Sequence, residues 1–283
     1  MRGGCRRLTR KAVCQTLMLT ACLSAIWPFQ GCVTPAEGGQ QFNILSTQEE
    51  IALGDKMAQQ IETEEKVLND PVIQDYVRVI GERLARLSPR TDVPYKFTVI
   101  DNPDTINAFA LPGGHMYIYT GLLKLCDNEA QLASVMGHEI GHVAAKHHGE
   151  SVTRQYGYSI LMGIILGDKS SQGAQVLAQL VGTAGEMRFS RVQEHEADRL
   201  GMDLLWRAGY QPEAMAAFMQ KMQQIEQEKG GGRAPLPFFS SHPATADRIT
   251  NLQNLAMQYP ADLRANSPTY AERYQEKVLS RLN

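Results

Sequence analysis

The body of this 283-residue chain contains almost no cysteine. Four of the five cysteines lie within the first 32 residues, and only Cys126 follows them. A disulfide framework is therefore excluded from the body of the chain, where we expect Cys126 to be a small, buried, apolar side chain.

The chain also lacks an excess of charge of one sign. Its 28 lysines and arginines nearly balance 30 acidic residues, which gives a formal net charge of −2. The body has no basic stripe and no basic segment interleaved with aromatic residues, so we do not expect nucleic acid to be a partner. Length and a hydrophobic content of 43% are sufficient for a globular domain with a sizeable core.

Long hydrophobic runs are missing after residue 37. The longest, residues 160–166, is far shorter than the roughly 20 residues that a spanning helix needs. It belongs to a region punctuated by glycine, residues 151–185, for which we expect a packed helical hairpin. A loop that touches a membrane is the alternative for this region.

The first 37 residues differ from the rest. Basic residues cluster between positions 2 and 11, and no charged side chain follows until Glu37. A basic segment followed by an apolar one is typical of a secretory signal. Because Leu19-Thr20-Ala21-Cys22 fits a bacterial lipoprotein processing box, we predict a signal peptide over residues 1–21, lipidation of Cys22 and a tether over residues 22–45. The alternatives are processing before Cys32, with residues 1–31 as the signal, and an uncleaved membrane anchor.

Hydrophobic periodicity and capping signals predict one domain over residues 46–283, of the α+β class and mainly helical. A strand is expected over residues 95–100, and two more within residues 107–120, joined across residues 112–114. The expected helices cover approximately residues 46–67, 70–88, 127–148, 190–208, 211–230, 243–257 and 268–282. We expect the small sheet to lie beside the helix over residues 127–148.

That helix carries the segment His138-Glu139-Ile140-Gly141-His142. The two histidines are four residues apart, so their imidazoles leave one helix face and can share a metal ion. Glu139 projects beside them and can act as a general base, because zinc lowers the pKa of water to roughly 7. Gly137 and Gly141 weaken the helix by up to about 1 kcal/mol each relative to alanine. Their presence predicts that another backbone packs closely there.

Catalytic zinc typically takes three protein ligands and one water, so the motif needs a third ligand from elsewhere. His148 stands where a metzincin has its third histidine. That class requires a glycine to turn the chain at the position of Ala145, and a continuing helix would carry His148 away from the metal. Glu194 is the better candidate, and it shares a helix face with Asp198, four residues further on. One can bind zinc while the other orients a ligand histidine; the alternative is a solvated, charged helix.

Four segments together are similar to a known family. They are Asn107-Ala108-Phe109-Ala110-Leu111-Pro112-Gly113-Gly114, the His138–His142 motif, Ser190-Arg191 leading into Glu194 and Asp198, and Ser241-His242-Pro243 with Arg248 downstream. From about Ser46 to Met257 the chain resembles the zincin-type metallopeptidases of the gluzincin clan, typified by the HtpX heat-shock protease and the CAAX prenyl endopeptidase. Within it, the chain looks like a soluble periplasmic lipoprotein branch.

The resemblance implies one Zn2+ per chain, held by His138, His142 and Glu194, with Glu139 as the general base. It implies that Asp198 supports a ligand histidine. Asn107, Ala108, Phe109 and Ala110 correspond to an edge strand on which an extended substrate can add. His242 corresponds to a histidine near the zinc, which either stabilises the oxyanion or occupies the open coordination position.

These features predict a periplasmic zinc endopeptidase, lipid-anchored to a membrane, most simply the outer membrane. Its expected partners are unfolded or misassembled envelope proteins, which it cleaves. The alternative is a chaperone-like binding module whose latent or structural zinc site is closed by His242. A metzincin-type enzyme that uses His148 is the third hypothesis.

Overall fold

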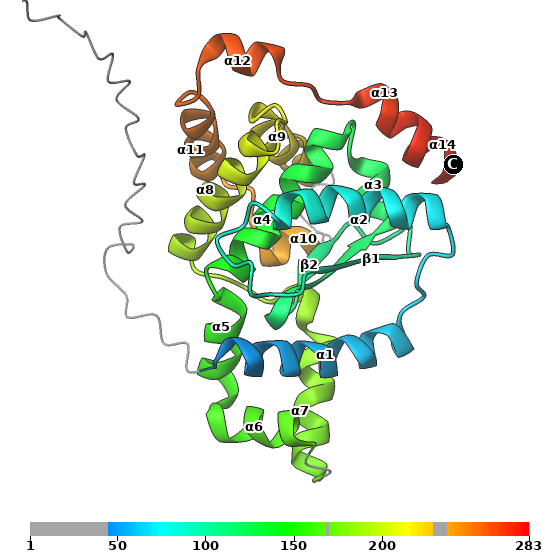
Figure 1. Ribbon diagram of the computed structural model, residues 1–283, viewed down its shortest axis with the longest axis vertical. Coiled ribbons are helices and arrows are strands. Elements are labelled where there is room, and N and C mark those ends of the chain that lie inside the picture. Colours follow the sequence, from blue (N-terminus) through cyan, green and yellow to red (C-terminus); the bar gives the residue numbers. More distant parts are fainter. Residues whose placement is uncertain (1–44, 168–169, 229–236, 283) are drawn as a thin grey trace, which may run out of the picture. The chain divides into compact units, whose positions relative to one another are not determined.

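The computed structural model describes residues 45–167, 170–228 and 237–282, which belong to one compact unit (Figure 1). The predicted signal peptide, with Cys22 and Cys32, and the predicted tether up to residue 44 lie outside the described residues. Within the described part, no helix combines the length and the hydropathy needed to cross a membrane.

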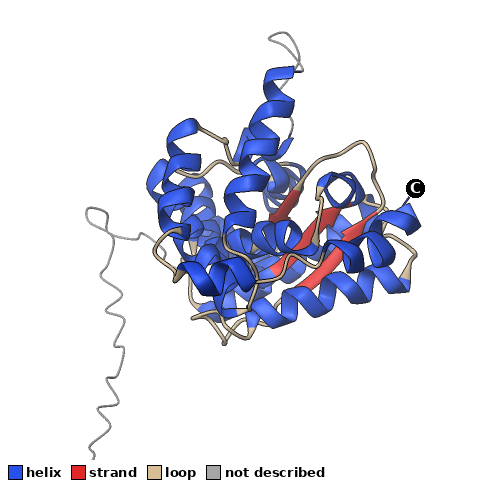
Figure 2. Cartoon of the chain, turned by 90° about the horizontal axis from the view of Figure 1, so that it is seen from above, coloured by secondary structure: helices blue, strands red, loops and turns tan. Residues whose placement is uncertain are grey.

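The three expected strands are present and lie side by side (Figure 2). They are β1 (Lys96–Ile100), β2 (Ala108–Ala110) and β3 (His115–Tyr119), in the order β1-β3-β2. Strand β1 runs parallel to β3, and β2 runs antiparallel to it. Strand β2 is therefore an edge strand of the described sheet, and the predicted mainly helical α+β fold with a small sheet is confirmed.

Alternation along the strands gives the sheet two buried faces. One face, which includes Met116 and Ile118, packs on α2 (Pro71–Ala85) and α4 (Glu129–Ala144). The other face presents the rings of Tyr117, Tyr119 and Phe109 to α1 (Thr47–Glu64) and to the hairpin of α6 (Tyr158–Leu166) and α7 (Ser171–Gly182). The sheet is therefore enclosed on both sides, with α1 between it and the hairpin (Figure 1).

The turn between β2 and β3 requires glycine. A short 3-10 helix, η1 (Pro112–Gly114), forms it, with φ of 76° at Gly113 and 93° at Gly114. These left-handed angles are accessible to glycine at little cost. The turn packs closely against α1. A Cβ at Gly54 of α1 would lie only 1.9 Å from the Pro112 carbonyl oxygen, so this position also requires glycine.

Helix starts follow the sequence signals closely. Ser46 and Glu49 form a capping box at α1, and Asp70 accepts hydrogen bonds from the first turn of α2. Ser190 caps α8 (Arg191–Arg207) in the same way, and Gly209, with φ of 79°, follows its end. Helices α1 and α2 end about three residues before their expected ends, which is the usual uncertainty of helix ends.

Helices α4 and α8 pack together through glycine. A Cβ at Gly141 would lie 2.7 Å from the carbonyl oxygen of Ala197, and one at Gly137 would lie 3.1 Å from that of Gly201. A Cβ at Gly201 would in turn meet the His138 backbone nitrogen at 2.8 Å. The close backbone packing predicted for Gly137 and Gly141 is confirmed, and it brings Glu194 and Asp198 of α8 towards the histidines of α4.

The helix predicted to run from residue 127 to residue 148 ends earlier, so that prediction is wrong. Helix α4 stops at Ala144, and Lys146 adopts a left-handed conformation with φ of 60°. A new helix, α5 (His147–Tyr156), then begins in another direction. His147 and His148 therefore lie at the start of a helix, not near the end of one as expected, and both are buried.

The remaining described helices are mostly shorter. The hairpin of α6 and α7 expected within residues 151–185 is confirmed. Helices that the periodicity did not predict include α3, η2, α10 and α12, which have six residues or fewer each and therefore carry too little pattern. The elements are α3 (Thr120–Leu125), η2 (Ala184–Glu186), α9 (Glu213–Glu228), α10 (Pro237–Ser241), α11 (Ala246–Ala256), α12 (Ala261–Asn266), α13 (Ala271–Tyr274), η3 (Gln275–Leu279) and α14 (Ser280–Leu282).

Candidate metal centre

Four buried side chains from three parts of the chain converge on one point. His138 and His142 come from α4, Glu194 from α8, and His242 from the residue after α10. One ligand atom from each lies within 4.8 Å of the ligand atoms of the other three. These four residues, which we call the metal cluster, are therefore placed to share one metal ion.

The spacing within the metal cluster suits a tetrahedral ion. His138 Nε2 lies 3.1 Å from His142 Nε2 and 3.2 Å from His242 Nδ1. Glu194 Oε1 lies 2.9 Å from His242 Nδ1 and 3.5 Å from His142 Nε2, and Glu194 Oε2 lies 3.5 Å from His138 Nε2. Ligands held at about 2.0–2.1 Å in a tetrahedron are about 3.3 Å apart. The observed separations scatter around that value.

The charge of the surroundings also suits a cation. The carboxylates of Glu139, Glu194 and Asp198 are buried together with a single guanidinium, that of Arg248. Buried charges need compensation. When all three carboxylates are ionised and the histidines are neutral, as metal-binding histidines are, two negative charges are left over, and one divalent cation would balance them.

Asp198 and Arg248 contact two residues of the metal cluster, His138 and Glu194, and hold them in place. Asp198 Oδ1 lies 2.9 Å from His138 Nδ1, on the side of the ring away from the other ligand atoms. Although burial opposes it, hydrogen bonds to Asp198 and Glu194 raise the pKa of His138 to about 9. Arg248 donates to both oxygens of Asp198, at 2.7 and 2.8 Å, and its Nη1 lies 2.6 Å from Glu194 Oε2. Arg248 thus holds both carboxylates of α8 in place.

Glu139 lies beside the metal cluster and not within it. Its Oε2 accepts a hydrogen bond from the Ala110 backbone N–H, at 3.2 Å. Its Oε1 lies 3.3 Å from His242 Nε2 but makes no hydrogen bond in the described part of the chain. Burial raises the pKa of this carboxyl. An anchored carboxylate with one available oxygen and a raised pKa is suited to take up a proton.

Two side chains that touch His142 could not be predicted from the sequence. His147 Nδ1 lies 2.9 Å from His142 Nδ1, and the Phe189 ring stacks on the His142 ring at 4.1 Å between centroids. Both contacts depend on turns, at Lys146 and before α8, that carry no periodic signal. Arg248 appeared in the sequence only as part of a family pattern, without a role.

His148 stays outside the metal cluster. It is buried, and its ring centroid lies 5.9 Å from that of His142, edge to face. Burial lowers the pKa of His148 to about 3, so its ring is neutral. The expectation that His148 is not a ligand agrees with this placement, but the reason given was wrong, because the chain does turn after α4.

The predicted substrate strand turns some of its backbone groups outward, away from β3. The Tyr119 N–H donates to the Asn107 carbonyl at 3.1 Å, and the Leu111 N–H donates to the His115 carbonyl at 2.8 Å. Because such bonds alternate along an antiparallel strand, the backbone groups of Ala108 and Ala110 point away from β3. The Ala110 N–H, which points outward, donates a hydrogen bond to Glu139 Oε2.

This outer edge of β2 is covered in the structure. Element η2 packs beside β2, where Asn107 Nδ2 donates to the Gly185 carbonyl at 3.0 Å. The side chains of Ala108, Phe109 and Ala110 are all buried. The predicted substrate strand is thus beside the general-base candidate but beneath a cover.

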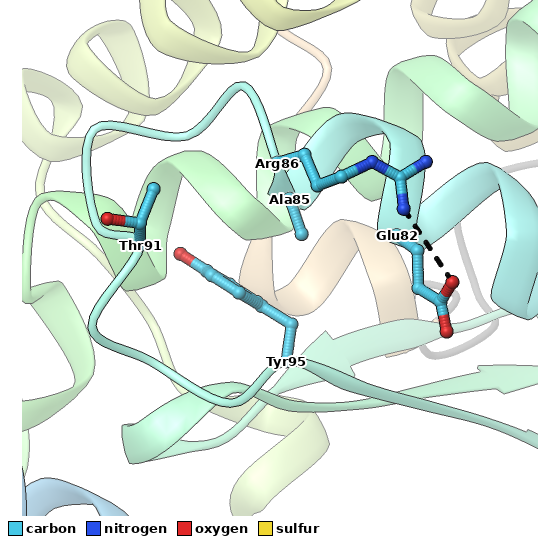
Figure 3. A pocket seen from close by; sticks show the side chains of 5 residues that line it. All are labelled: Glu82, Ala85, Arg86, Thr91 and Tyr95. Carbon is cyan, nitrogen blue, oxygen red and sulfur yellow. Dashed lines mark ion pairs between the residues drawn. The ribbon is translucent and has the colours of Figure 1, made fainter.

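A separate hollow of about 250 Å3 lies at the end of α2. Thr91 and Tyr95 line it, and Glu82 faces Arg86 across 3.8 Å (Figure 3). None of its lining residues belongs to the metal cluster or to β2. We therefore do not assign it to the same site.

The metal cluster lies in a part of the chain that matches a known protein family. Residues 71–256, which include the metal cluster, match the family described as peptidase family M48.

This chain belongs to peptidase family M48.

The predicted relationship to metallopeptidases is therefore confirmed at the level of the family, of which the HtpX and CAAX prenyl endopeptidase type is a related branch.

Relatives of this M48 chain include the beta-barrel assembly-enhancing protease of Escherichia coli (strain K12), which is 34% identical over 233 residues, or 79% of this chain and 47% of the relative. The same-named protein of Yersinia pestis is 31% identical over 271 residues, 90% and 54% of the two chains. The mitochondrial metalloendopeptidase OMA1 of Schizosaccharomyces pombe is 31% identical over 178 residues, 63% and 51%. The M48 chain thus spans about half the length of these relatives.

Proposed function

We propose that this chain is a zinc-dependent endopeptidase that hydrolyses misfolded or stalled proteins of the bacterial envelope. The observation that carries the proposal is the convergence of His138, His142 and Glu194 beside Glu139, whose Oε1 is available. The same metal cluster on its own would support only metal binding. The Glu139 carboxylate beside it, hydrogen-bonded to the edge strand β2, adds a general base for peptide hydrolysis.

Zinc is the proposed ion because the donors are imidazole nitrogens and a carboxylate oxygen in tetrahedral spacing. His138, His142 and Glu194 would hold it. Zinc supplies a Lewis acid, which makes water acidic enough to be deprotonated near neutral pH. Asp198 fixes the ring orientation of His138 through its second nitrogen, and Arg248 keeps Asp198 and Glu194 ionised.

Glu139 has the role of general base in this proposal. It accepts a proton from the attacking water and can return it to the leaving amine. Its hydrogen bond from the Ala110 N–H fixes the base relative to β2. A peptide that pairs with the outward backbone groups of Ala108 and with the Ala110 carbonyl would therefore be held in register with the base.

His242 determines whether the site is open. Its Nδ1 takes the fourth position of the metal cluster, and its Nε2 faces Glu139. Catalytic zinc sites keep one position free of protein ligands, whereas structural sites are closed. We infer that the arrangement described here is a closed form, and that His242 must withdraw from the metal cluster before water and substrate enter.

The closed arrangement also favours the second candidate function, a chaperone-like binding module with a latent or structural zinc site. The two candidates differ in what removal of His242 does. In an endopeptidase, His242→Ala opens a coordination position and exposes Glu139. In a binding module, the same change only weakens the metal site.

An envelope location is part of the proposal. Relatives named beta-barrel assembly-enhancing protease support envelope proteins as substrates. The predicted lipoprotein signal, with Cys22 or Cys32 as the lipidated residue, supports a periplasmic, membrane-tethered protein. Mass spectrometry of the protein purified from membranes would identify the lipidated cysteine, and an unmodified chain that starts at Met1 would contradict this part.

The test of the function uses metal removal and restoration. The wild-type chain and the His242→Ala variant are treated with a chelator, reloaded with one equivalent of zinc, and assayed on unfolded casein. We expect hydrolysis to disappear with the metal and to return with zinc, and to be faster in His242→Ala. Bound zinc with no hydrolysis in either protein would favour the binding module, and hydrolysis that survives chelation would overturn the proposal.

A further inference from the structure

A second hollow, of about 220 Å3, lies next to the outer edge of β2. Its walls come from the C-terminal end of α1, from the strands and from the segment that joins α7 to η2. Helices α1 and α7 pack on each other below the sheet in the view of Figure 1. Residues of both helices line the hollow. It is smaller than the 300–1,000 Å3 typical of sites for whole small molecules, and its size suits one long side chain.

The walls of this hollow carry negative charge without compensation. Glu64 and Glu65 of α1 and Glu186 of η2 line it, and none of its lining residues is lysine, arginine or histidine. The three carboxylates make no ion pair within the described part of the chain. Glu65 accepts a hydrogen bond from the Tyr119 hydroxyl at 3.2 Å, and Glu64 accepts one from Gln60 Nε2 at 2.7 Å. Glu64 and Glu186 are exposed. A cation that enters the hollow would thus meet an uncompensated negative field.

A buried polar atom in the wall also lacks a partner. Asn107 is only 3% exposed, and its Nδ2 donates to the Gly185 carbonyl. Its Oδ1 accepts no hydrogen bond within the described residues. A buried acceptor without a donor is unfavourable, and a donor brought by a bound group would satisfy it.

The rest of the hollow is apolar. The rings of Phe109 and Tyr119, 6.3 Å apart between centroids, form part of its wall. An aliphatic stem or a guanidinium plane can pack on such rings while its charged end stays near the carboxylates. A lysine or arginine side chain combines the stem, the charge and the hydrogen-bond donors that the wall requires.

A peptide can pair with β2 only after η2 has moved from the outer edge of that strand, so the walls that a bound peptide meets are those of α1 and the sheet, with Glu64, Glu65, Asn107 and Phe109. Asn107 precedes Ala110, the residue that is hydrogen-bonded to the general base, by three positions. At about 3.3 Å per residue, this separation is about 10 Å along an extended chain. Asn107 and Phe109 face the α1 side of the sheet, so alternate side chains of a paired peptide would face the hollow.

We propose that this hollow is a substrate subsite for a lysine or arginine side chain, about three residues from the peptide bond that is cleaved. The proposal rests on the proposed function, since it assumes that the substrate pairs with β2. The chemical class it selects is a basic, extended peptide segment.

The test compares two peptides that differ at one position. One has arginine three residues from the scissile bond, and the other has citrulline, which has the same shape without the charge. The full-length, zinc-loaded chain with His242→Ala serves as the parent. We expect kcat/KM for the arginine peptide to be about tenfold higher, a size typical of one charge pair at a binding site. The preference should disappear in Glu64→Gln/Glu186→Gln, which leaves the Glu65 bond to Tyr119 intact.

A charge-matched control separates the subsite from the global charge. Glu62 lies on α1 and is exposed but does not line the hollow, and Glu226 is exposed on α9. Glu62→Gln/Glu226→Gln removes the same net charge, and we expect it to retain the preference for arginine. If this control loses the preference as well, the selectivity is general electrostatics and the subsite is wrong.

The failure of the subsite can be told apart from the failure of the proposed function. Equal cleavage of both peptides by the parent would overturn the subsite and leave the endopeptidase function standing. If neither peptide is cleaved, the binding of both fluorescently labelled peptides to Glu139→Gln/His242→Ala is measured by anisotropy. Tighter binding of the arginine peptide, lost in the variant without Glu64 and Glu186 carboxylates, would still support the subsite; equal binding would reject it.

Discussion

The metal cluster has two unlike sides. On one side, His138, His142 and Glu194 stand on two long helices, α4 and α8, which approach each other through glycine. Arg248 joins the carboxylates of α8 to this framework. We call this the framework side of the site.

The other side is built from short segments. His242 follows the five-residue helix α10, Phe189 lies in the connection between η2 and α8, and η2 itself has three residues. The Phe189 ring stacks on the rings of His142 and His242, and η2 packs beside β2. We call this the cover. The comparison indicates that the framework side determines metal binding and stability, whereas the cover determines access.

The largest effect is expected where the framework side loses its buried cation. Arg248→Met leaves Glu194 and Asp198 buried without their common partner. Breaking a buried ion pair by removing one member typically costs about 3–5 kcal/mol. We expect urea unfolding to show a loss of stability of this order, together with weaker zinc retention.

Arg281→Met is the control for the loss of a guanidinium. Arg281 pairs with Asp70 at 2.9 Å with its side chain 41% exposed, and exposed pairs contribute about 0–1 kcal/mol. If both variants lose equally little stability, Arg248 does not hold the framework side together.

An intermediate effect is expected from Gly141→Ala. The added methyl group would lie 2.7 Å from the Ala197 carbonyl oxygen, so α4 and α8 must move apart. Overpacking of this kind costs about 1–3 kcal/mol, and it would also displace Glu194 from the histidines. We expect both the free energy of unfolding and zinc affinity to fall, as measured by urea unfolding and competition with a chelator.

Gly182→Ala is the matched control, because it lies in α7 and its added methyl group meets nothing within 4 Å. It should be neutral or slightly stabilising, by up to about 1 kcal/mol. Unchanged zinc affinity in Gly141→Ala would show that the helix spacing does not set the metal site.

The smallest effect on stability is expected on the cover. Phe189→Ala removes a ring that stacks on His142 and, at 5.8 Å, on His242. Such aromatic contacts contribute about 0.5–1.5 kcal/mol. We expect zinc content to stay at one per chain and hydrolysis of unfolded casein to increase. Loss of zinc in this variant would place Phe189 on the framework side and contradict the division.

The elements that could be predicted from the sequence are those with local causes. The Ser46 and Ser190 caps need only a glutamate or glutamine three residues later, and the strands need only alternation and a glycine turn. Gly137 and Gly141 indicated a close contact between two helices, because glycine inside a helix is otherwise unfavourable. These features establish the fold and one face of the site.

The elements that could not be predicted depend on distant contacts. Nothing local marks Lys146 for a left-handed conformation, yet that single residue ends α4 and brings His147 to His142. Arg248 reaches Asp198 across 50 positions, a pairing that exists only after α8 and α11 pack. His242 owes its place to a helix too short to have a period. Apart from His242, the residues of the cover could therefore not be predicted from the sequence.

The central claim is that Glu139 is the base of a zinc endopeptidase, and one variant tests it most directly. Glu139→Gln keeps an oxygen that can accept the Ala110 N–H but removes the basic group. Zinc content, thermal unfolding and hydrolysis of unfolded casein are measured together, in the wild-type and His242→Ala backgrounds. We predict one zinc per chain, an unchanged fold and hydrolysis reduced by about 10²- to 10⁴-fold. Unchanged hydrolysis in the Glu139→Gln protein would contradict the account.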